Sequence, residues 1–305
     1  MQDFQNKIAV VTGGGSGMGR DLCLQLAAEG CHIALSDISM ETADETRDMA
    51  TSLAPSGTRI TSHDCDVSDE KSVNSWRDAV VAEHETDHVN LVFNNAGIGG
   101  GGAFVDGSRD DWERTFGVCW YGVYYCSRAF MPMLVASEEG HIVNTSSING
   151  FWASLGPQRS HTAYSAAKFA VKGFTEALVT DLRLNAPHVK ASVVMPGHIG
   201  TGIALNSTQV LGHEVSSYVT EMSAQFRNSA PTTSEQAATI ILDGVRAERW
   251  RILVGDDAHM IDSMVRDEPE EAYEESFRER LVEQNTMAGV MNRQRGEASF
   301  GSADD

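Results

Sequence analysis

The chain has 305 residues, 41% of them hydrophobic, which is enough for one large α/β domain with a complete core. Its formal net charge of -20 at pH 7 would repel a phosphate backbone, so binding to nucleic acid is not expected. The N-terminus lacks the pattern of a signal peptide, and no apolar run reaches the roughly 18 residues of a membrane span. We therefore expect a cytoplasmic protein with no membrane segment.

The five cysteines are scattered along the chain, and no two of them form a Cys-x-x-Cys pair. This pattern is typical of reduced thiols in a cytosolic protein rather than of a disulfide framework or a zinc site. Cys119 and Cys126 share one helix face and are interpreted as packing residues. We therefore predict no metal centre and reduced thiols at Cys23, Cys31, Cys65, Cys119 and Cys126.

The first predicted strand is the β-branched apolar run 8–11, and a glycine-rich loop, Thr12 to Gly19, follows it. A helical pattern over 20–29 comes next, and this order is the context of a dinucleotide-binding fingerprint. Glycines let the backbone approach a pyrophosphate, and the start of a helix supplies free N–H groups with a partial positive charge. The alternative is a flexible glycine turn without a ligand. On the cofactor interpretation the contacting residues are Gly13, Ser16, Gly17 and Met18.

Asp37 ends the second predicted strand, 32–36, and lies about 20 residues beyond the glycines. An acidic residue in this position accepts hydrogen bonds from the ribose hydroxyls of the adenosine and repels a 2′-phosphate. Ile38 follows it and offers no positive charge to hold such a phosphate. The pattern predicts NAD rather than NADP as cofactor, with a turn or helix-capping aspartate as the alternative.

A helix over 40–53 and a strand over 59–63 follow, and a second helix is expected from Ser68 to about residue 85. Asp66 lies between them, at the carboxyl end of the strand, where ligands dock in open α/β sheets. Its carboxylate suits the amino group of an adenine. Because spacing alone does not separate this role from that of a turn residue, both interpretations remain open.

A fourth strand, 89–93, ends in Asn94-Asn95-Ala96-Gly97, whose small residues and amides would let the backbone pass beside a ribose. A capping box at Ser108 to Asp111 predicts one long helix over 110–135. Aromatic residues recur along this helix at helical spacing, which favours packing in the core or at a subunit interface: Trp112, Phe116, Trp120 and Tyr124.

The fifth strand, 141–145, leads to Ser147, and the next predicted helix carries Tyr164 and Lys168. With about 3.6 residues per turn, a helix places side chains four apart on one face. A tyrosine hydroxyl is a poor base at neutral pH, but a nearby cation lowers its pKa and makes it a usable general acid or base. A serine opposite this helix would donate a hydrogen bond to a substrate oxygen. The alternatives are an ordinary surface pair and a satisfied loop serine.

After a sixth strand, 190–195, the segment 203–230 has apolar residues spaced like one or two short helices, and we predict a lid over the substrate. A capping box at Thr232 and Glu235 starts a helix to about residue 247, and a last strand covers 250–254. The acidic tract 256–283 is typical of a solvated helix face, and the small polar end, 296–305, is expected to be mobile. We thus expect a domain over 1–255 and an acidic helical extension over 256–305.

Together these motifs resemble those of the short-chain dehydrogenase/reductase family over residues 5–255. The resemblance implies a single Rossmann-type, doubly wound α/β domain with a seven-stranded parallel sheet flanked by helices. It implies that Ser147, Tyr164 and Lys168 are catalytic, with Lys168 also holding the nicotinamide ribose. The remaining cofactor contacts that it implies are Asp37, Asp66, Val67, Asn94, Ala96, Gly97, Tyr164, Lys168, Pro196, Gly197, Ile199 and Thr201.

The chain departs from the family pattern at two places. Cys119 stands where the family has an asparagine that helps fix a water behind the lysine, so the resemblance does not extend to the proton relay. The loop 151–161 is longer than usual, should lie over the substrate, and carries aromatic residues that favour an apolar partner. The residues expected around the substrate are Ser147, Phe151, Trp152, Leu155, Tyr164, His198, Ile203 and Leu205.

We therefore expect an NAD-dependent oxidoreductase that interconverts a secondary alcohol and a ketone, such as a steroid, terpenoid or aryl carbinol, and that forms a homodimer or homotetramer. The alternative from another class is a non-catalytic NAD-binding protein that senses redox state or scaffolds a partner, a hypothesis motivated by Cys119 and the acidic tail. The third hypothesis is that the protein catalyses a different reaction on the same fold. An epimerase would favour a longer chain, and an enoyl reductase would space its tyrosine further from its lysine.

Overall fold

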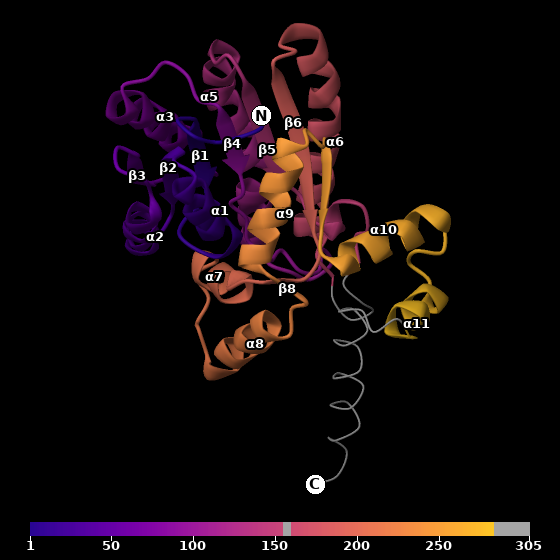
Figure 1. The fold of residues 1–305 in the computed structure, drawn as a ribbon. Helices are drawn as coiled ribbons and strands as arrows, with labels where there is room; N and C mark the ends of the chain where they lie inside the picture. Colours follow the sequence, from indigo (N-terminus) through magenta and orange to yellow (C-terminus); the bar gives the residue numbers. More distant parts are fainter. Residues whose placement is uncertain (155–159, 284–305) are drawn as a thin grey trace.

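A parallel β-sheet of seven strands forms the centre of the protein (Figure 1). The structure, a computed structural model, describes residues 1–154 and 160–283. The strand order is β3-β2-β1-β4-β5-β6-β9, and every neighbouring pair is parallel. The predicted seven-stranded, doubly wound sheet is therefore confirmed. Its strands are β1 (Ile8–Thr12), β2 (His32–Asp37), β3 (Ile60–Asp64), β4 (Leu91–Asn94), β5 (Gly140–Thr145), β6 (Val189–Pro196) and β9 (Arg251–Val254).

Helices cover both faces of this sheet, as a parallel sheet requires. One face packs against α1 (Gly17–Ala28), α2 (Met40–Leu53) and α9 (Ser234–Arg246). The other face packs against α3 (Glu70–His84), α5 (Gly122–Ala136) and α6 (Thr162–Asn185).

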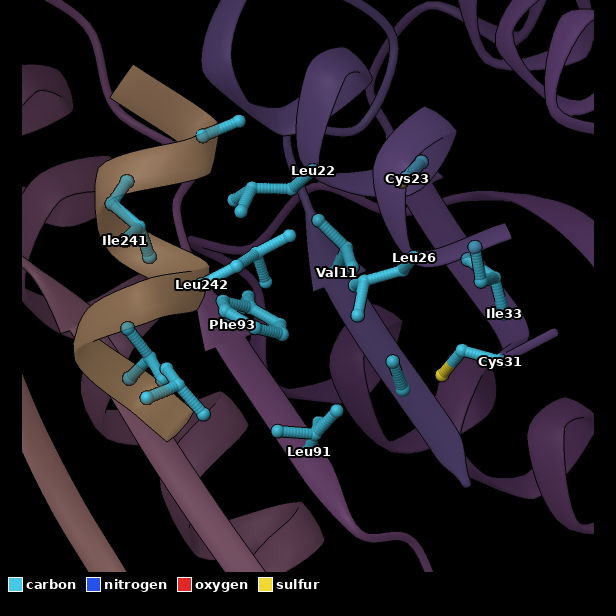
Figure 2. Close-up of a cluster of buried hydrophobic side chains, with 14 of the residues drawn as sticks. Val11, Leu22, Cys23, Leu26, Cys31, Ile33, Leu91, Phe93, Ile241 and Leu242 are labelled. Atoms are coloured by element: carbon cyan, nitrogen blue, oxygen red, sulfur yellow. The ribbon is translucent and has the colours of Figure 1, made fainter. Parts of the chain in front are cut away.

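Alternate residues of the inner strands contribute to two separate cores. On β1, Ala9 and Val11 face the α1/α9 side, whereas Ile8 and Val10 face the α3/α5/α6 side. In Figure 2, side chains of α1 and α9 meet Val11 and Phe93 of the sheet, and all of these are buried. Because both faces are buried, the strands read as continuous apolar runs, which is why the sequence reveals them.

The chain reverses its direction of travel across the sheet between β1 and β4. From β1 it moves to β2 and β3 on one side, and it then returns to β4 on the other. In open α/β sheets, ligands bind in the crevice outside the carboxyl ends of the strands at such a reversal. The fold therefore brings the glycine-rich loop after β1 and the loop after β4 to a common crevice.

The predicted long helix over 110–135 is interrupted. It consists of α4 (Arg109–Phe116), a π-helical turn over Gly117–Tyr121 and then α5. Such turns insert one extra residue into a helix and are frequent at functional sites. Cys119 lies in the middle of this turn. The irregular turn therefore coincides with the position at which this chain has a cysteine and the family pattern has an asparagine.

The predicted lid contains two helices, α7 (Ile203–Val210) and α8 (Ser217–Asn228). Its two ends are joined because β7 (Ile199–Gly200) pairs with β8 (Thr232–Thr233). The capping box that starts α9 is formed by Thr233 and Gln236, one residue later than predicted, since Thr232 is part of β8. The lid is thus anchored at its base by a small two-stranded ribbon.

The acidic tract folds into α10 (Asp256–Asp267) and α11 (Glu275–Glu283), and it is more than a solvated face. A cluster of buried side chains joins this tract to the main domain. The prediction of a solvated helix face, which rested on charge alone, is therefore corrected. Glutamates and aspartates dominate the composition, but apolar residues at helical spacing make the contacts. The buried members are Ile148, Trp152, Ala258, Ile261, Ala272, Phe277 and Leu281. The end predicted to be mobile, 296–305, lies outside the described residues.

In the part of the chain that the structure describes, no helix is both long and apolar enough to cross a membrane. Over residues 1–154 and 160–283, no group of three or more His, Cys, Asp or Glu side chains could hold a metal ion. All five cysteines lie in these ranges, and each is free and buried.

His141 on β5 should make the stability of the fold sensitive to acid. Its Nε2 lies 2.7 Å from the Ser192 Oγ, which itself donates to the Arg249 carbonyl at 2.6 Å, so Nε2 carries the proton. Within the described residues the buried Nδ1 has no partner, and burial lowers the pKa of His141 to about 3. A protonated form would therefore carry a buried, unpaired N–H group.

The unfolded chain binds this proton near pH 6.5, so it holds more protons than the folded protein between pH 3 and 6.5. Stability is therefore lost as the pH falls through this window. We expect His141 to lower the free energy of unfolding by about 2 kcal/mol between pH 7.5 and 5. Urea unfolding of the wild type and of His141→Leu at both pH values measures this loss, which should be smaller in His141→Leu. An equal loss in both proteins would contradict the assignment, and the same replacement at exposed His259 is the control.

Candidate active site

The loop after β1 turns sharply because two glycines adopt conformations that other residues avoid. Gly13 has φ 63° and Gly17 has φ 52°, both in the left-handed region. A Cβ at Gly13 would lie 2.9 Å from the Ala96 Cα, so this loop and the loop after β4 touch. Gly17 is also the first residue of α1, whose free N–H groups therefore point into the crevice.

A cavity of about 260 Å³ opens between the carboxyl ends of β1, β2 and β4 and the lid helix α7. It brings together residues that are far apart in the sequence. Its lining includes ten of the residues predicted to contact the cofactor, namely Gly13, Ser16, Gly17, Met18, Asp37, Asp66, Val67, Ala96, Gly97 and Thr201.

The carboxylate of Asp37 is fixed at the end of β2, on the cavity wall. Its Oδ2 accepts a hydrogen bond from the Gly15 N–H at 2.9 Å, and its Oδ1 accepts one from the Ser39 N–H at 3.1 Å. Ser39, not Asp37, caps α2, which excludes the helix-capping alternative. Each carboxylate oxygen keeps a further lone pair, so Asp37 can still accept hydrogen bonds from a ligand.

Asp66 is held as a turn residue, and it also lies on the wall of the cavity. It accepts hydrogen bonds from Ser68 and from the Arg114 Nη1 at 2.7 Å, and it also lines the cavity. Burial by itself would raise the pKa of Asp66, but the bonds from Ser68 and Arg114 outweigh burial and lower it. The carboxylate is therefore ionised and neutralises the Arg114 guanidinium. The helix after it is capped by Asp69 rather than by Ser68.

Asn94, which the resemblance implied as a cofactor contact, faces away from the cavity. It is 2% exposed, and its Nδ2 donates to the Asn144 Oδ1 at 2.7 Å and to the Ser127 Oγ at 3.1 Å. Its amide therefore joins β4 to β5 and α5. Ile199 is likewise buried in the core beside α9, so neither side chain lines the cavity.

Asn95, one position later, is the side chain that the sequence argument missed. Its Nδ2 donates to the Thr12 carbonyl at 3.1 Å, it lines the cavity, and its buried Oδ1 has no partner among the described residues. The doubled asparagine was the available signal, but strand alternation was needed to tell the two apart. The other lining residues not predicted as cofactor contacts are Ile38, Ser39, Thr42, Cys65, Ile98, Arg114, Val118, Gly202, Ile203, Asn206, Gln209 and Val210.

Ser147, Tyr164 and Lys168 converge just beyond the Gly97 wall of this cavity. Tyr164 lies in the first turn of α6, and the Ser147 hydroxyl is close enough to affect the pKa of its phenol. The Lys168 Nζ lies 5.4 Å from the centre of the Tyr164 ring and donates to the Thr145 carbonyl at 2.8 Å. A Cβ at Gly97 would be only 3.4 Å from the same Nζ. The three side chains thus form one group at the end of the crevice.

The electrostatics of this group differ from the prediction that the lysine lowers the pKa of the tyrosine. Burial raises the pKa of Tyr164, and the nearby Ser147 hydroxyl only partly opposes this. Burial also lowers the pKa of Lys168, which is 2% exposed. Although Tyr164 as a residue keeps some exposure, its hydroxyl is desolvated by its neighbours. Without a bound cofactor, burial therefore has the largest effect on the pKa values of both Tyr164 and Lys168.

Cys119 lies next to this group. Its Sγ donates to the Ile98 carbonyl at 3.2 Å, so it holds the start of the loop after Gly97. The point where a Cβ at Gly97 would lie is 3.8 Å from this sulfur and 3.4 Å from the Lys168 Nζ. Cys119 therefore occupies the space beside the lysine and also contributes to the raised pKa of Tyr164.

The sequence model of the family described as short chain dehydrogenase matches residues 7–211 of this chain. The chain belongs to the short-chain dehydrogenase family. As a member, it is an oxidoreductase at the level of the family, and this family binds a nicotinamide cofactor.

Several members of the short-chain dehydrogenase family are similar over most of the chain. The Mycobacterium tuberculosis oxidoreductase SadH is 38% identical over 87% of this chain and 92% of its own length. The meso-2,3-butanediol dehydrogenase of Serratia marcescens is 34% identical over 67% of this chain and 70% of its own. The solved structure of a short chain dehydrogenase/reductase from Burkholderia phymatum in complex with NAD has a TM-score of 0.77 and 32% identity, covering 89% and 95% of the two chains.

Two residues of this short-chain dehydrogenase that were predicted to contact substrate are instead buried in protein contacts. Trp152 is 1% exposed, and its Nε1 donates to the Ala272 carbonyl at 2.8 Å. His198 is 2% exposed, and its Nε2 lies 2.7 Å from the Phe226 carbonyl. Both predictions were wrong, because apolar character and position near the site do not reveal which partner covers a side chain. Leu155, predicted beside them, lies outside the described residues.

Proposed function

We propose that this protein is an NAD-dependent oxidoreductase that interconverts a secondary alcohol and a ketone in the cytoplasm. The observation that carries the proposal is the grouping of Ser147 and Tyr164 with the buried Lys168 one helical turn away, beside the cavity that Asp37 lines. A proton-transferring hydroxyl, a positive charge and a hydrogen-bond donor are the groups that oxidation of an alcohol requires.

The cavity has the features that a dinucleotide needs. The glycine loop brings bare backbone to its wall, and the start of α1 offers free N–H groups and the positive end of a helix dipole to a pyrophosphate. Asp37 offers acceptors for two ribose hydroxyls, and the unpaired Oδ1 of Asn95 offers one more. We assign the adenosine half to this cavity and the nicotinamide half to the space beside Gly97 and Thr201.

Ser147, Tyr164 and Lys168 each have a separate role in the reaction. Tyr164 takes the hydroxyl proton of the alcohol, while Ser147 donates a hydrogen bond to the same oxygen and orients it. Lys168 favours the charged form of the phenol and binds the ribose next to the nicotinamide. When bound, NAD⁺ supplies the hydride acceptor and a positive charge that acts in the same direction as Lys168. This charge opposes the rise in the pKa of Tyr164 that burial causes.

The aromatic face of α5 and α6 supports a homodimer or homotetramer. Tyr121, Tyr124 and Phe169 are 44%, 38% and 42% exposed, although each is a large apolar side chain. Stacked and edge-on ring contacts continue along this surface, from Trp112 to Tyr125. Exposed aromatic side chains on neighbouring helices are typical of subunit contacts.

A panel of secondary alcohols and ketones assayed with NAD and NADP tests the proposal. Because a carboxylate at Asp37 repels a 2′-phosphate, we expect kcat/KM with NAD to be about 100-fold higher. Since Ile203 lines the cavity and Phe151 and Leu205 remain partly exposed, we also expect better kcat/KM for aryl carbinols, terpenoid alcohols and steroids than for polyols.

Each part of the proposal can fail separately in this panel. A preference for NADP would reject the cofactor assignment. Higher kcat/KM on polyols, or on the small diol named for the Serratia relative, would reject the substrate class. The absence of turnover on every member would favour a non-catalytic NAD-binding protein, which the cysteine beside Lys168 also suggests.

A further inference from the structure

The segment 256–283, which we call the C-terminal clamp, contacts two loops near the reacting group. In Figure 1 its helices α10 and α11 lie to the right of the sheet near its lower end, and the lid helices lie below that end. One loop follows Ser147 and the other is the turn Pro196 to His198 after β6. These contacts link the extension to both sides of the space assigned to the nicotinamide.

The first contact is made through Trp152. Its indole N–H donates to the Ala272 carbonyl at 2.8 Å, and its ring centre lies 5.7 Å from that of Phe277. One residue further on, the Ala153 N–H donates to the Tyr273 hydroxyl at 3.1 Å. Because Ile148 belongs to the same buried cluster, the clamp holds this loop from the residue directly after Ser147.

The loop held in this way is packed directly on the helix that carries Lys168. The Ser146 Oγ donates to the Lys168 carbonyl at 2.7 Å, and a Cβ at Gly150 would lie 2.8 Å from the same oxygen. No larger residue fits at Gly150 without displacing this helical turn. A shift of the loop would therefore move Ser147 relative to Lys168.

The second contact is made through Asp257, in the first turn of α10. This carboxylate is 7% exposed, and its Oδ2 accepts a hydrogen bond from the His198 N–H at 2.6 Å. A Cβ at Gly197 would collide with it, so the turn and the carboxylate are in close contact. The His198 ring in turn binds the Phe226 carbonyl at 2.7 Å, which connects the clamp to the end of lid helix α8.

We propose that the C-terminal clamp positions the reacting group and that Asp257 is the positioning residue that fixes the turn Pro196 to His198. The inference rests on the proposed function and deepens it, since it assigns a role to a segment that the family motifs do not include. Displacements of about 1 Å in groups that align reactants lower rates strongly, even when they arise away from the chemistry. Asp257 therefore acts through the turn and touches neither substrate nor cofactor.

The test compares Asp257→Ala with Asp257→Asn and with Asp256→Ala, since Asp256 is the exposed neighbour in the same helical turn. We expect Asp257→Ala to lower kcat by about 10- to 100-fold. Asparagine keeps an acceptor for the His198 N–H, so Asp257→Asn should stay within about threefold of the wild type. Asp256→Ala should have wild-type kcat.

Binding of ADP-ribose separates positioning from general damage to the fold. This ligand needs the cavity beside Asp37, which the clamp does not line, so its Kd should be unchanged in all three variants. If Asp257→Ala lost ADP-ribose binding in proportion to kcat, or kept wild-type kcat, the proposal would be overturned.

Amide hydrogen exchange gives a readout that does not depend on turnover. In Asp257→Ala we expect faster exchange over 196–201 and unchanged exchange over 13–19. Unchanged exchange at both segments would overturn the clamp even in an active enzyme. Faster exchange at 196–201 in a protein whose wild type oxidises no alcohol would support the clamp and reject the proposed function.

Discussion

Replacing Tyr164 by phenylalanine is expected to lower kcat for alcohol oxidation by about 10³-fold, because general acid–base catalysis contributes on this order. The change removes only the phenol hydroxyl near Ser147 and leaves the ring beside Lys168 in place. NADH binding should therefore stay nearly unchanged. Initial rates followed by NADH absorbance, together with a fluorescence titration of NADH, measure both quantities.

Tyr124→Phe is the matched control for this experiment. Tyr124 is a 38%-exposed tyrosine on α5, so loss of its hydroxyl should leave kcat at the wild-type value unless it perturbs a subunit contact. Substantial turnover in Tyr164→Phe would reject the proton-transfer role. A parallel loss of NADH binding in that variant would show that the hydroxyl acts mainly in binding.

Replacing Lys168 by methionine is expected to lower kcat by about 100-fold or more and to shift the pH profile of kcat/KM toward higher pH. The side chain is buried, so its ammonium is a positive charge in a poorly hydrated region. Burial already raises the pKa of Tyr164, and removal of this charge should raise it further. Initial rates at low substrate and saturating NAD, measured across the pH range, give kcat/KM and show the direction of the shift.

Lys172→Met is the control, because Lys172 lies one helical turn further along α6 and pairs with Glu176 at 3.0 Å away from the site. It should change neither kcat nor the pH profile. Lys168→Met also leaves the Thr145 carbonyl without its donor, so a stability loss of about 1–3 kcal/mol is expected and should be measured alongside. An unshifted pH profile in a folded Lys168→Met protein would contradict the electrostatic role.

Much of the architecture follows from local patterns in the chain. The apolar strands, the glycine loop and Asp37 are short-range features whose geometry depends on neighbours within a few residues. Tyr164 and Lys168 meet for the same reason, since one turn of helix sets their separation. Position along the chain was therefore sufficient to identify these residues and the order of the elements.

Tertiary packing settles the features that depend on residues distant in the sequence. Trp152 and Ala272 are 120 positions apart, and their contact turns an apparent substrate residue into the anchor of the extension. Asn94 and Asn95 are chemically identical, yet the alternation of the strand sends one amide into the core and the other to the cavity. The pKa of Tyr164 also belongs to this class, because burial and its cost in hydration arise only when the remote elements close around the hydroxyl.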